Sequence, residues 1–368
     1  MRKGQNGPSR YAENLIINLA KIDKDNRYTV IVNNEYDSIV NADNFHIIPT
    51  SILPYRIKEH LAIPLLLQGE IYNVFHSLQY IPPAFIKRPL VMTVFDTMHM
   101  NYDFWGKSVQ RKIIGKYVQL LSGFSVHRCH SIITISNYSA NQIAKIFSYD
   151  RKRIFPIYLG INEPYEKRNN QKDFEYSSEK WNIKHPYILH ISNMRLYKNV
   201  EILLEAFAKY VAMDSKKIML VLAGKASEQD VNSKRELAKS LGIVDNVIFL
   251  RNLNNENLRA LLGGSIAFVF PSKDEGFGLP LLEAMAAGIP CIASNLEVFS
   301  EVCDDAPLYF EKNSVADLKD SIIRLVSSDR LRREMAIKGI DKARTFSWEN
   351  TAKMTIEVYN KVFEEITQ

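Results

Sequence analysis

The sequence of 368 residues lacks the features that mark a membrane-spanning or secreted protein. No uninterrupted apolar run approaches the roughly 20 residues that a helix needs to cross a bilayer. The first residues, Met1-Arg-Lys-Gly-Gln-Asn6, lack the apolar stretch of a signal peptide. No segment is of low complexity. The sequence therefore predicts a folded, cytoplasmic protein.

Cysteine is scarce, and its placement excludes the common cysteine-based sites. The three cysteines, Cys129, Cys291 and Cys303, fall in no metal-binding spacing and lie in or beside apolar sequence. The histidines show no ligand spacing either. We expect reduced cysteines that fill space in the core, and neither a metal nor a cofactor.

Motifs for nucleic acid are also missing. The net charge of +6 and the pI near 8.9 favour anionic partners. However, the chain contains no aromatic ribonucleoprotein motif, zinc finger or arginine-rich tail. We therefore expect no nucleic acid; an anionic membrane face and a diphosphate substrate are simpler targets.

What the sequence does contain is a repeated alternation of short apolar runs and helical patterns, which predicts parallel, doubly wound sheets. The chain is long enough for two domains. The polar segment 162–173 is the natural linker between them. The predicted strands are 28–32, 71–75, 90–95, 132–135 and 154–158, followed by 187–191, 218–223, 247–250, 266–270, 290–293 and 308–310.

The predicted fold class is therefore α/β, with two Rossmann-like domains and a ligand crevice between them. We expect an N-terminal domain over residues 1–165 and a second domain over residues 166–346. Residues 347–368 contain a final helix.

The beginning of the chain departs from this pattern. A doubly wound domain should open with a buried strand that leads into its first glycine loop. Here Gly4-Gln-Asn-Gly7 comes at once, and the helix 11–20 follows it. We expect that the first strand is missing and that the natural protein starts upstream of Met1.

The most informative stretch is Pro271-Ser-Lys-Asp-Glu-Gly-Phe-Gly-Leu-Pro-Leu-Leu-Glu283, which follows a buried apolar strand. Gly276 and Gly278 allow a tight turn and a close approach to a ligand. Pro280 suits the first turn of a helix, whose free amides can bind phosphate. A phosphate-bearing sugar fits this arrangement. The plain alternative is a strand, turn and helix with Glu283 as a solvated acid in the first turn.

This stretch closely resembles the Glu-x7-Glu signature of family-4 glycosyltransferases, the retaining enzymes of the GT-B fold. The resemblance implies that Glu275 contacts the transferred sugar and Glu283 the nucleotide ribose. It also implies that the final helix packs back on the N-terminal domain and that no metal is obligatory. The residues whose amides it places near the diphosphate and sugar are Gly276, Phe277, Gly278 and Leu279. The family's first glycine loop matches the region of Gly7, which we expect to bind substrate.

Two cations, Arg195 and Lys198, follow the predicted strand 187–191. The carboxyl end of a parallel strand is where such sheets bind ligands. There the two side chains could stabilise a departing nucleoside diphosphate. The family uses a similar Arg-x-x-Lys-Asn segment for this task, and Asn199 is the expected helix cap. The alternative is a pair of ordinary surface cations.

In the first domain, Asp96 matches a His-Asp pair that many family members carry, but Phe95 replaces the histidine. His99, three residues later, is a candidate for a catalytic role, and a structural role stays equally open. Ser139 is the expected cap of the next helix.

Cations and apolar residues interleave over residues 107–121. This pattern is typical of a helix at an anionic lipid surface. It is also typical of a helix whose apolar residues face the core while its cations are solvated. The cations are Lys107, Arg111, Lys112 and Lys116, and the apolar residues are Val109, Ile113, Ile114, Tyr117 and Leu121.

The sequence thus predicts a retaining glycosyltransferase that uses a nucleoside diphosphate sugar as donor, with a mannose-type sugar as a first guess. The expected acceptor is a glycan or lipid-linked molecule in surface polysaccharide synthesis, at the cytoplasmic face of the membrane. A catalytically inactive nucleotide-sugar-binding module is one alternative. A dinucleotide-dependent oxidoreductase is another, but its Gly-x-Gly-x-x-Gly loop is absent.

Overall fold

The computed structural model describes residues 7–53, 56–100, 109–161, 170–213 and 217–368. The chain divides into two compact units, which we call unit 1 and unit 2. Unit 1 comprises Met1–Gly160 together with Phe346–Gln368, and unit 2 comprises Ile161–Thr345.

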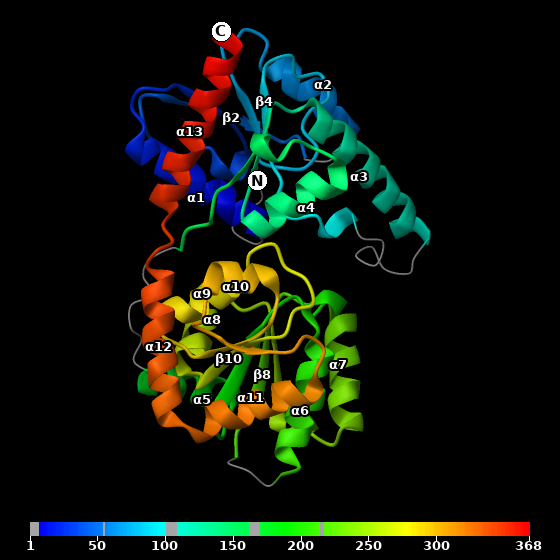
Figure 1. The fold of residues 1–368 in the computed structure, drawn as a ribbon, viewed down its shortest axis with the longest axis vertical. Helices are drawn as coiled ribbons and strands as arrows, with labels where there is room; N and C mark the ends of the chain where they lie inside the picture. Colours follow the sequence, from blue (N-terminus) through cyan, green and yellow to red (C-terminus); the bar gives the residue numbers. More distant parts are fainter. Residues whose placement is uncertain (1–6, 54–55, 101–108, 162–169, 214–216) are drawn as a thin grey trace. The chain divides into compact units, whose positions relative to one another are not determined.

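Unit 2 is built on a six-stranded parallel sheet (Figure 1). Its strands are β7 (Tyr187–Ile191), β8 (Met219–Gly224), β9 (Val247–Arg251), β10 (Ala267–Phe270), β11 (Cys291–Ser294) and β12 (Leu308–Phe310). The strand order is β12-β11-β10-β7-β8-β9, so the chain leaves β7 in one direction and returns to β10 on its other side. Sheets of this kind bind ligands outside the carboxyl ends of the strands, at the point of reversal.

The helices of unit 2 cover this sheet because their apolar residues recur at helical spacing. They are α5 (Asn170–Trp181), α6 (Val200–Val211), α7 (Glu228–Ser240), α8 (Asn255–Gly264), α9 (Leu279–Ala286), α10 (Glu297–Cys303), α11 (Val315–Ser327) and α12 (Asp329–Ala343). In α6, Leu203, Leu204 and Phe207 are fully buried. They share one core cluster with alternate residues of β8, Leu220 and Leu222, which point to the same face of the sheet.

Unit 1 contains two separate parallel sheets. The strands are β1 (Tyr28–Asn33), β2 (Phe45–Thr50), β3 (Phe75–Ser77), β4 (Leu90–Thr93), β5 (Ser131–Thr134) and β6 (Ile154–Pro156). β1 pairs with β2, while β3 to β6 pair in chain order. Within the described residues no strand joins these two sheets. The helices are α1 (Gly7–Ile22), α2 (Ile57–Leu66), α3 (Val109–Arg128), α4 (Asn137–Phe147) and α13 (Trp348–Thr367).

The last helix, α13, belongs to the core of unit 1. It packs against α1 (Figure 1), and its Val358 and Val362 lie in one cluster with Val91 of β4 and Ile133 of β5. The hydroxyl of Thr351 also donates a hydrogen bond of 2.7 Å to the Tyr158 carbonyl. The expected return of the final helix to the first domain is therefore confirmed.

Unit 1 departs from the sequence prediction at three places. The predicted strand 71–75 is displaced, since β3 begins only at Phe75 and Ile71 is 94% exposed. The strand β2 was not predicted. Gly7 is the first residue of α1 and not part of a loop, because Pro8 and the residues after it already suit the first turn of a helix. Gly4 lies outside the described residues.

Of the two predicted helix caps, one is wrong and the other is confirmed in its position. The cap of α4 is Ser136, whose side chain accepts the amide of Ser139, so Ser139 itself lies inside the helix. Asn199 is the N-cap residue of α6, as expected, although its backbone is left-handed (φ 54°) and its side chain makes no capping bond. Asparagine tolerates this conformation better than most residues, and that explains its presence there.

Candidate active site

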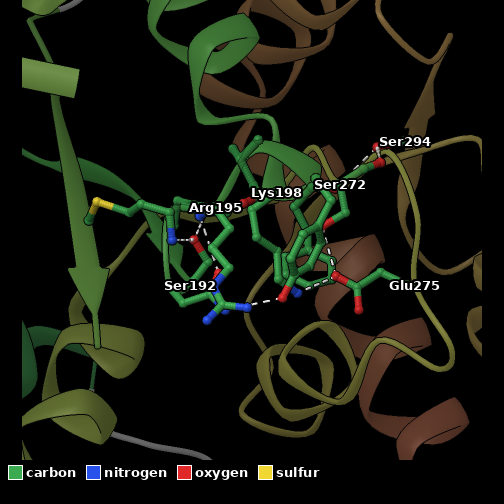
Figure 2. A network of polar contacts seen from close by, with 12 residues as sticks. Ser192, Arg195, Lys198, Ser272, Glu275 and Ser294 are labelled. Atoms are coloured by element: carbon green, nitrogen blue, oxygen red, sulfur yellow. Dashed lines mark hydrogen bonds and ion pairs between the residues drawn. The ribbon is translucent and has the colours of Figure 1, made fainter. Parts of the chain in front are cut away.

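Two loops of unit 2 meet where the strand order reverses (Figure 2). The first follows β7 and carries Ser192 to Lys198, and the second follows β10 and carries Ser272 to Glu275. The amide of Lys273 donates a hydrogen bond of 2.7 Å to the Tyr197 carbonyl, which fastens one loop to the other. The candidate site is thus built on the carboxyl ends of two adjacent strands, β7 and β10.

The centre of the site is an ion pair between Lys198 and Glu275. The two side chains are only 12% and 10% exposed. The Ser272 hydroxyl donates to the same carboxylate oxygen, Oε1, at 2.8 Å, and Ser294 donates to the Ser272 carbonyl at 2.7 Å (Figure 2). The Lys198 ammonium also lies 5.1 Å from the centre of the Phe270 ring. The pair therefore sits in a largely desolvated place with its geometry fixed by hydroxyl groups.

A buried histidine, His190, holds the start of the first loop in place. His190 of β7 lies between the Val269 carbonyl (Nδ1 to O, 2.8 Å) and the Ser192 hydroxyl (Nε2 to Oγ, 2.7 Å). Burial lowers its pKa to about 4, and the charge of Lys198 acts in the same direction. The ring is therefore neutral near pH 7, donates to the carbonyl and accepts from Ser192. Ser192 in turn accepts the amide of Met194 at 3.0 Å, so the loop is held in one shape.

The second predicted cation, Arg195, has a different environment. Its side chain is exposed, and its amide donates to the Asn193 side chain at 3.2 Å. In Figure 2, Arg195 lies on the same loop as Lys198. The structure thus brings Lys198 to Glu275 and leaves the guanidinium of Arg195 accessible to a ligand.

The glycine loop between Glu275 and α9 has the shape that the sequence predicted. Gly278 has φ 93°, and a Cβ at this position would lie 2.7 Å from the Phe299 ring. Helix α9 begins at Leu279 with Pro280 in its first turn, and Phe277 is 2% exposed. The Leu281 amide already donates to the Gly278 carbonyl at 2.9 Å and Pro280 has no amide hydrogen, so Leu279 is the residue of this first turn whose amide is suited to an anion.

The acidic residues around this loop differ in environment. Glu283 lies in α9, about one turn from its start, and is half-buried. Asp274, next to Glu275, has a raised pKa because it is partly buried and because the Glu275 carboxylate is close. An added anion would meet negative charge here unless the cations and amides of the site offset it.

In unit 1, the structure places Asp96 and His99 just after β4. The Asp96 side chain accepts the Met98 amide at 3.0 Å and is half-buried. His99 is 4% exposed and stacks on Tyr80 with 4.4 Å between ring centres. Burial lowers its pKa to about 4, so the ring is neutral near pH 7. Phe95 packs edge-on against Tyr11 of α1.

Sequence reasoning missed the groups that orient the ion pair, which are His190, Ser192, Ser272 and Ser294. Ser192 and Ser272 each follow a predicted strand by one or two residues, and this position could have identified them. His190 gave no such signal, because a single histidine inside an apolar strand does not by itself indicate a functional role.

The residues that the structure describes contain no group of three or more His, Cys, Asp or Glu side chains placed to hold a metal ion. All three cysteines are buried and unpaired. In the described part of the chain, none of the helices is both long and apolar enough to cross a membrane.

Two family models match this chain, one over each unit, and both describe glycosyltransferases. The family model described as "Glycosyl transferases group 1" matches residues 171–342. A second model, "Glycosyltransferase Family 4", matches residues 5–163. The resemblance drawn from Glu275 and Glu283 is therefore confirmed.

Curated relatives include enzymes that build O-antigen chains. The chain is 29% identical over 245 residues to the O-antigen chain mannosyltransferase B of Escherichia coli. This match covers 66% of this chain and 64% of that protein. The chain is 32% identical over 193 residues to the O-antigen chain mannosyltransferase RfbU of Salmonella typhimurium, covering 52% and 50%. The matched region thus spans less than two thirds of these relatives.

Solved structures show the same fold. WaaG, a glycosyltransferase involved in lipopolysaccharide biosynthesis, has a TM-score of 0.73 at 15% identity, over 96% of both chains. Anabaena HepE in complex with UDP-glucose has a TM-score of 0.77 at 14% identity, over 97% of this chain and 98% of that one. The expected GT-B fold is confirmed.

Proposed function

The chain belongs to the group 1, family-4 glycosyltransferases, and we propose that it transfers a sugar from a nucleoside diphosphate donor with retention at the anomeric carbon. The acceptor in this proposal is a glycan or lipid-linked molecule of a surface polysaccharide, reached at the cytoplasmic face of the membrane.

The observation that carries the proposal is the Lys198–Glu275 pair at the reversal of the unit 2 sheet. A buried ion pair is seldom more stabilising than apolar residues of the same size, because both charges lose their hydration. A cation and a carboxylate held together at a ligand-binding position therefore favour a role in chemistry. The glycine loop and the start of α9 directly beyond Glu275 add the donors that a diphosphate needs.

In the proposed reaction, unit 2 binds the donor. Glu275 binds hydroxyls of the transferred sugar, and Glu283 binds the ribose. Lys198 and Arg195 stabilise the negative charge that develops on the leaving diphosphate, together with the amides of the glycine loop. Lys198 can do so only after it exchanges part of its contact with Glu275 for the phosphate oxygens.

Unit 1 presents the acceptor in this proposal, with Asp96 nearest the sugar. His99 enters as a neutral ring, since its lowered pKa excludes an imidazolium near pH 7. We assign no protein nucleophile and no metal, and the donor itself is the only small molecule required.

The relatives' names favour a mannose-type donor and an O-antigen acceptor as the first to be tested. A nucleotide-linked glucose is the second donor to test, because the HepE structure holds UDP-glucose.

A catalytically inactive sugar-nucleotide-binding module is the second candidate function. It is favoured by one observation: Phe95 fills the place of the family's histidine and packs in the core against Tyr11. The oxidoreductase alternative has no support, because both matched families are glycosyltransferases.

Calorimetry with a panel of nucleoside diphosphate mannose, glucose and N-acetylglucosamine donors tests the proposal. We expect one donor to bind and to be slowly hydrolysed without acceptor. Transfer to a lipid-linked oligosaccharide should then give a product whose anomeric configuration, measured by NMR, matches the donor. Binding without any hydrolysis or transfer would identify the inactive module, and an inverted product would refute retention.

A further inference from the structure

Helices α2 and α3 of unit 1 leave many large apolar side chains exposed. The exposed fractions range from 38% to 75%, which is far above the values in the cores of either unit. These side chains are Leu61, Leu65 and Leu66 on α2, Phe85 on the following segment, and Ile113, Ile114, Tyr117, Leu120 and Phe124 on α3. We call this surface the α2–α3 face, after the two helices that carry most of it (labelled in Figure 1). One interpretation of residues 107–121 is a helix whose apolar residues face the core. That interpretation is wrong for Ile113, Ile114 and Tyr117.

Exposed side chains from both helices meet in one groove. A groove of about 300 Å³ is lined by Leu61 of α2, by Ile81 and Phe85, and by Tyr117 and Phe124 of α3. On α3 the exposed residues 113, 117, 120 and 124 recur at three- and four-residue spacing, so they lie along one side of the helix. A continuous apolar surface of this kind is rare on a protein that has no partner.

Polar groups beneath the groove bond to the protein itself, although Arg128 Nε is buried without a hydrogen-bond partner among the described residues. The Arg128 guanidinium donates to the carbonyls of Pro83 (2.9 Å) and Ala84, and the Ala84 amide donates to His60 Nδ1 at 3.0 Å. These bonds turn the polar atoms toward the protein. What is left to meet a partner is hydrocarbon and aromatic surface.

The charges around the α2–α3 face are of one sign. Lys58, Lys112 and Lys116 are exposed on α2 and α3. Residues 109–128 contain no acidic residue. The one acid of α2, Glu59, is buried and accepts a hydrogen bond from Gln79 at 2.5 Å. An apolar strip with cations and an exposed tyrosine beside it is complementary to an anionic bilayer, where aromatic rings favour the headgroup region.

A second copy of the chain fits this surface less well. In a two-fold dimer the same patch meets itself, which would place lysines of α3 close to the lysines of the partner copy without acids between them. Anionic headgroups supply the missing negative charge.

We propose that the α2–α3 face seats the protein on an anionic lipid bilayer. In this arrangement Leu120, Ile113 and Phe124 enter the boundary between headgroups and acyl chains, the groove takes a hydrocarbon segment of a lipid, and Lys112 and Lys116 lie at the lipid phosphates. The proposal does not depend on the sugar chemistry of unit 2, because binding to lipid can be measured without donor or acceptor.

Co-sedimentation of the full chain with vesicles tests the proposal. One set of vesicles contains equal parts of phosphatidylglycerol and phosphatidylcholine, and the other contains phosphatidylcholine alone. We expect binding to the anionic vesicles that falls steeply as salt is raised. Replacing both Lys112→Gln and Lys116→Gln should weaken it about 25-fold, at roughly fivefold for each lost charge.

Apolar variants separate insertion from simple charge attraction. Ile113→Ser with Leu120→Ser should lower vesicle binding even at low salt, since these side chains are 64% and 75% exposed and can be changed without opening the core. Ile337→Ser on α12, 63% exposed in unit 2, is the matched control and should bind like the parent. Lys239→Gln on α7 is the matched control for charge.

Several results would overturn the proposal. They are absence of binding to the anionic vesicles, equal binding by the lysine variants, or equal binding by the serine variants with unchanged thermal melting. A concentration-dependent dimer that the serine variants abolish, without vesicle binding by the parent, would show that the occupant is a second copy.

Discussion

In both units the candidate residues lie at or beyond the ends of parallel strands, but their surroundings differ. In unit 2, β7 and β10 lead to a lysine and a carboxylate in contact. In unit 1, the rings in β3 and just after β4 are uncharged, and the Asp96 carboxylate after β4 accepts the Met98 amide at 3.0 Å. His76 lies between the hydroxyls of Tyr359 (2.7 Å) and Thr93 (2.8 Å), and burial lowers its pKa to about 3. Phe95 packs on Tyr11 and His99 on Tyr80.

The difference teaches where the chemistry lies. Neutral, hydrogen-bonded rings can serve a core at little cost, whereas desolvated charges need a further reason to be present. The charged site of unit 2 is the expected donor side, and unit 1 contributes a surface for the acceptor and the carboxylate of Asp96. The predictions below would sharpen this contrast or break it.

The largest expected effect is that of Glu275→Ala. Loss of the carboxylate removes the proposed contact to the sugar and leaves Lys198 without its partner, so transfer should fall by about 10²–10³-fold or more. Binding of the nucleoside diphosphate should stay close to that of the parent. Calorimetry and a transfer assay measure the two effects. Asp96→Asn in unit 1 is the companion variant, and a larger loss of transfer there than for Glu275→Ala would reverse the roles of the units.

Lys198→Ala should lower transfer about 10²-fold, because the leaving diphosphate loses a desolvated cation. Arg195→Ala should have a smaller effect, since its side chain is exposed and its charge is screened. Transfer rates and thermal melting are compared for both variants. An unchanged rate with a collapsed melting temperature would assign Lys198 a structural role.

Glu283→Ala should weaken binding of the nucleotide itself by about 1–3 kcal/mol, the cost of a lost hydrogen bond to a charged group. Calorimetry with the nucleoside diphosphate, without its sugar, measures this. Affinity equal to that of the parent would contradict the ribose role. Glu301 on α10 is half-buried like Glu283 and has no role in the proposal, so Glu301→Ala serves as the control.

The smallest effect concerns the neutral histidines. His99 has a pKa of about 4 in the folded chain, below the ordinary value of 6.5, so the unfolded chain binds the proton more tightly. The contribution of neutral His99 to the unfolding free energy is therefore fully present above about pH 6.5 and is lost as the pH drops toward 4. Between about pH 7 and pH 5 the preference of the unfolded chain for the proton should lower the unfolding free energy by about 2 kcal/mol. His99→Phe keeps the stack on Tyr80 and should remove this loss. Chemical denaturation at both pH values measures this difference. If the unfolding free energy of the variant fell with pH as much as that of the parent, the neutral, buried state of His99 would be contradicted.

Unit 2 was more predictable from sequence than unit 1, and the reason is burial. Strands such as β8 and β10 are buried along their whole length, so an unbroken apolar run marks them. β2 is half-exposed and contains His46 and Pro49, which hide it. Ile71 is apolar but exposed, so the same rule gave a false strand start.

The charged residues of the site could be predicted because they follow strands directly. The orientation of the ion pair could not, since it depends on hydrogen bonds between residues distant in sequence. Ser294, for example, reaches the Ser272 carbonyl from β11. The exposure of α3 was equally hidden, because an amphipathic pattern does not say whether its apolar side meets a core or a membrane.

The place of α13 has a consequence for the order of events during synthesis on the ribosome. Unit 1 takes its last helix from residues 346–368, after all of unit 2 has been made. Val358 and Val362 are part of its core, so the N-terminal unit cannot be completed when its first 160 residues emerge. At about 5–20 residues per second, the wait is on the order of ten seconds or more. The unit that is second in the chain can therefore be the first to reach its native state, and the nascent unit 1 is the stage at which chaperones would be needed.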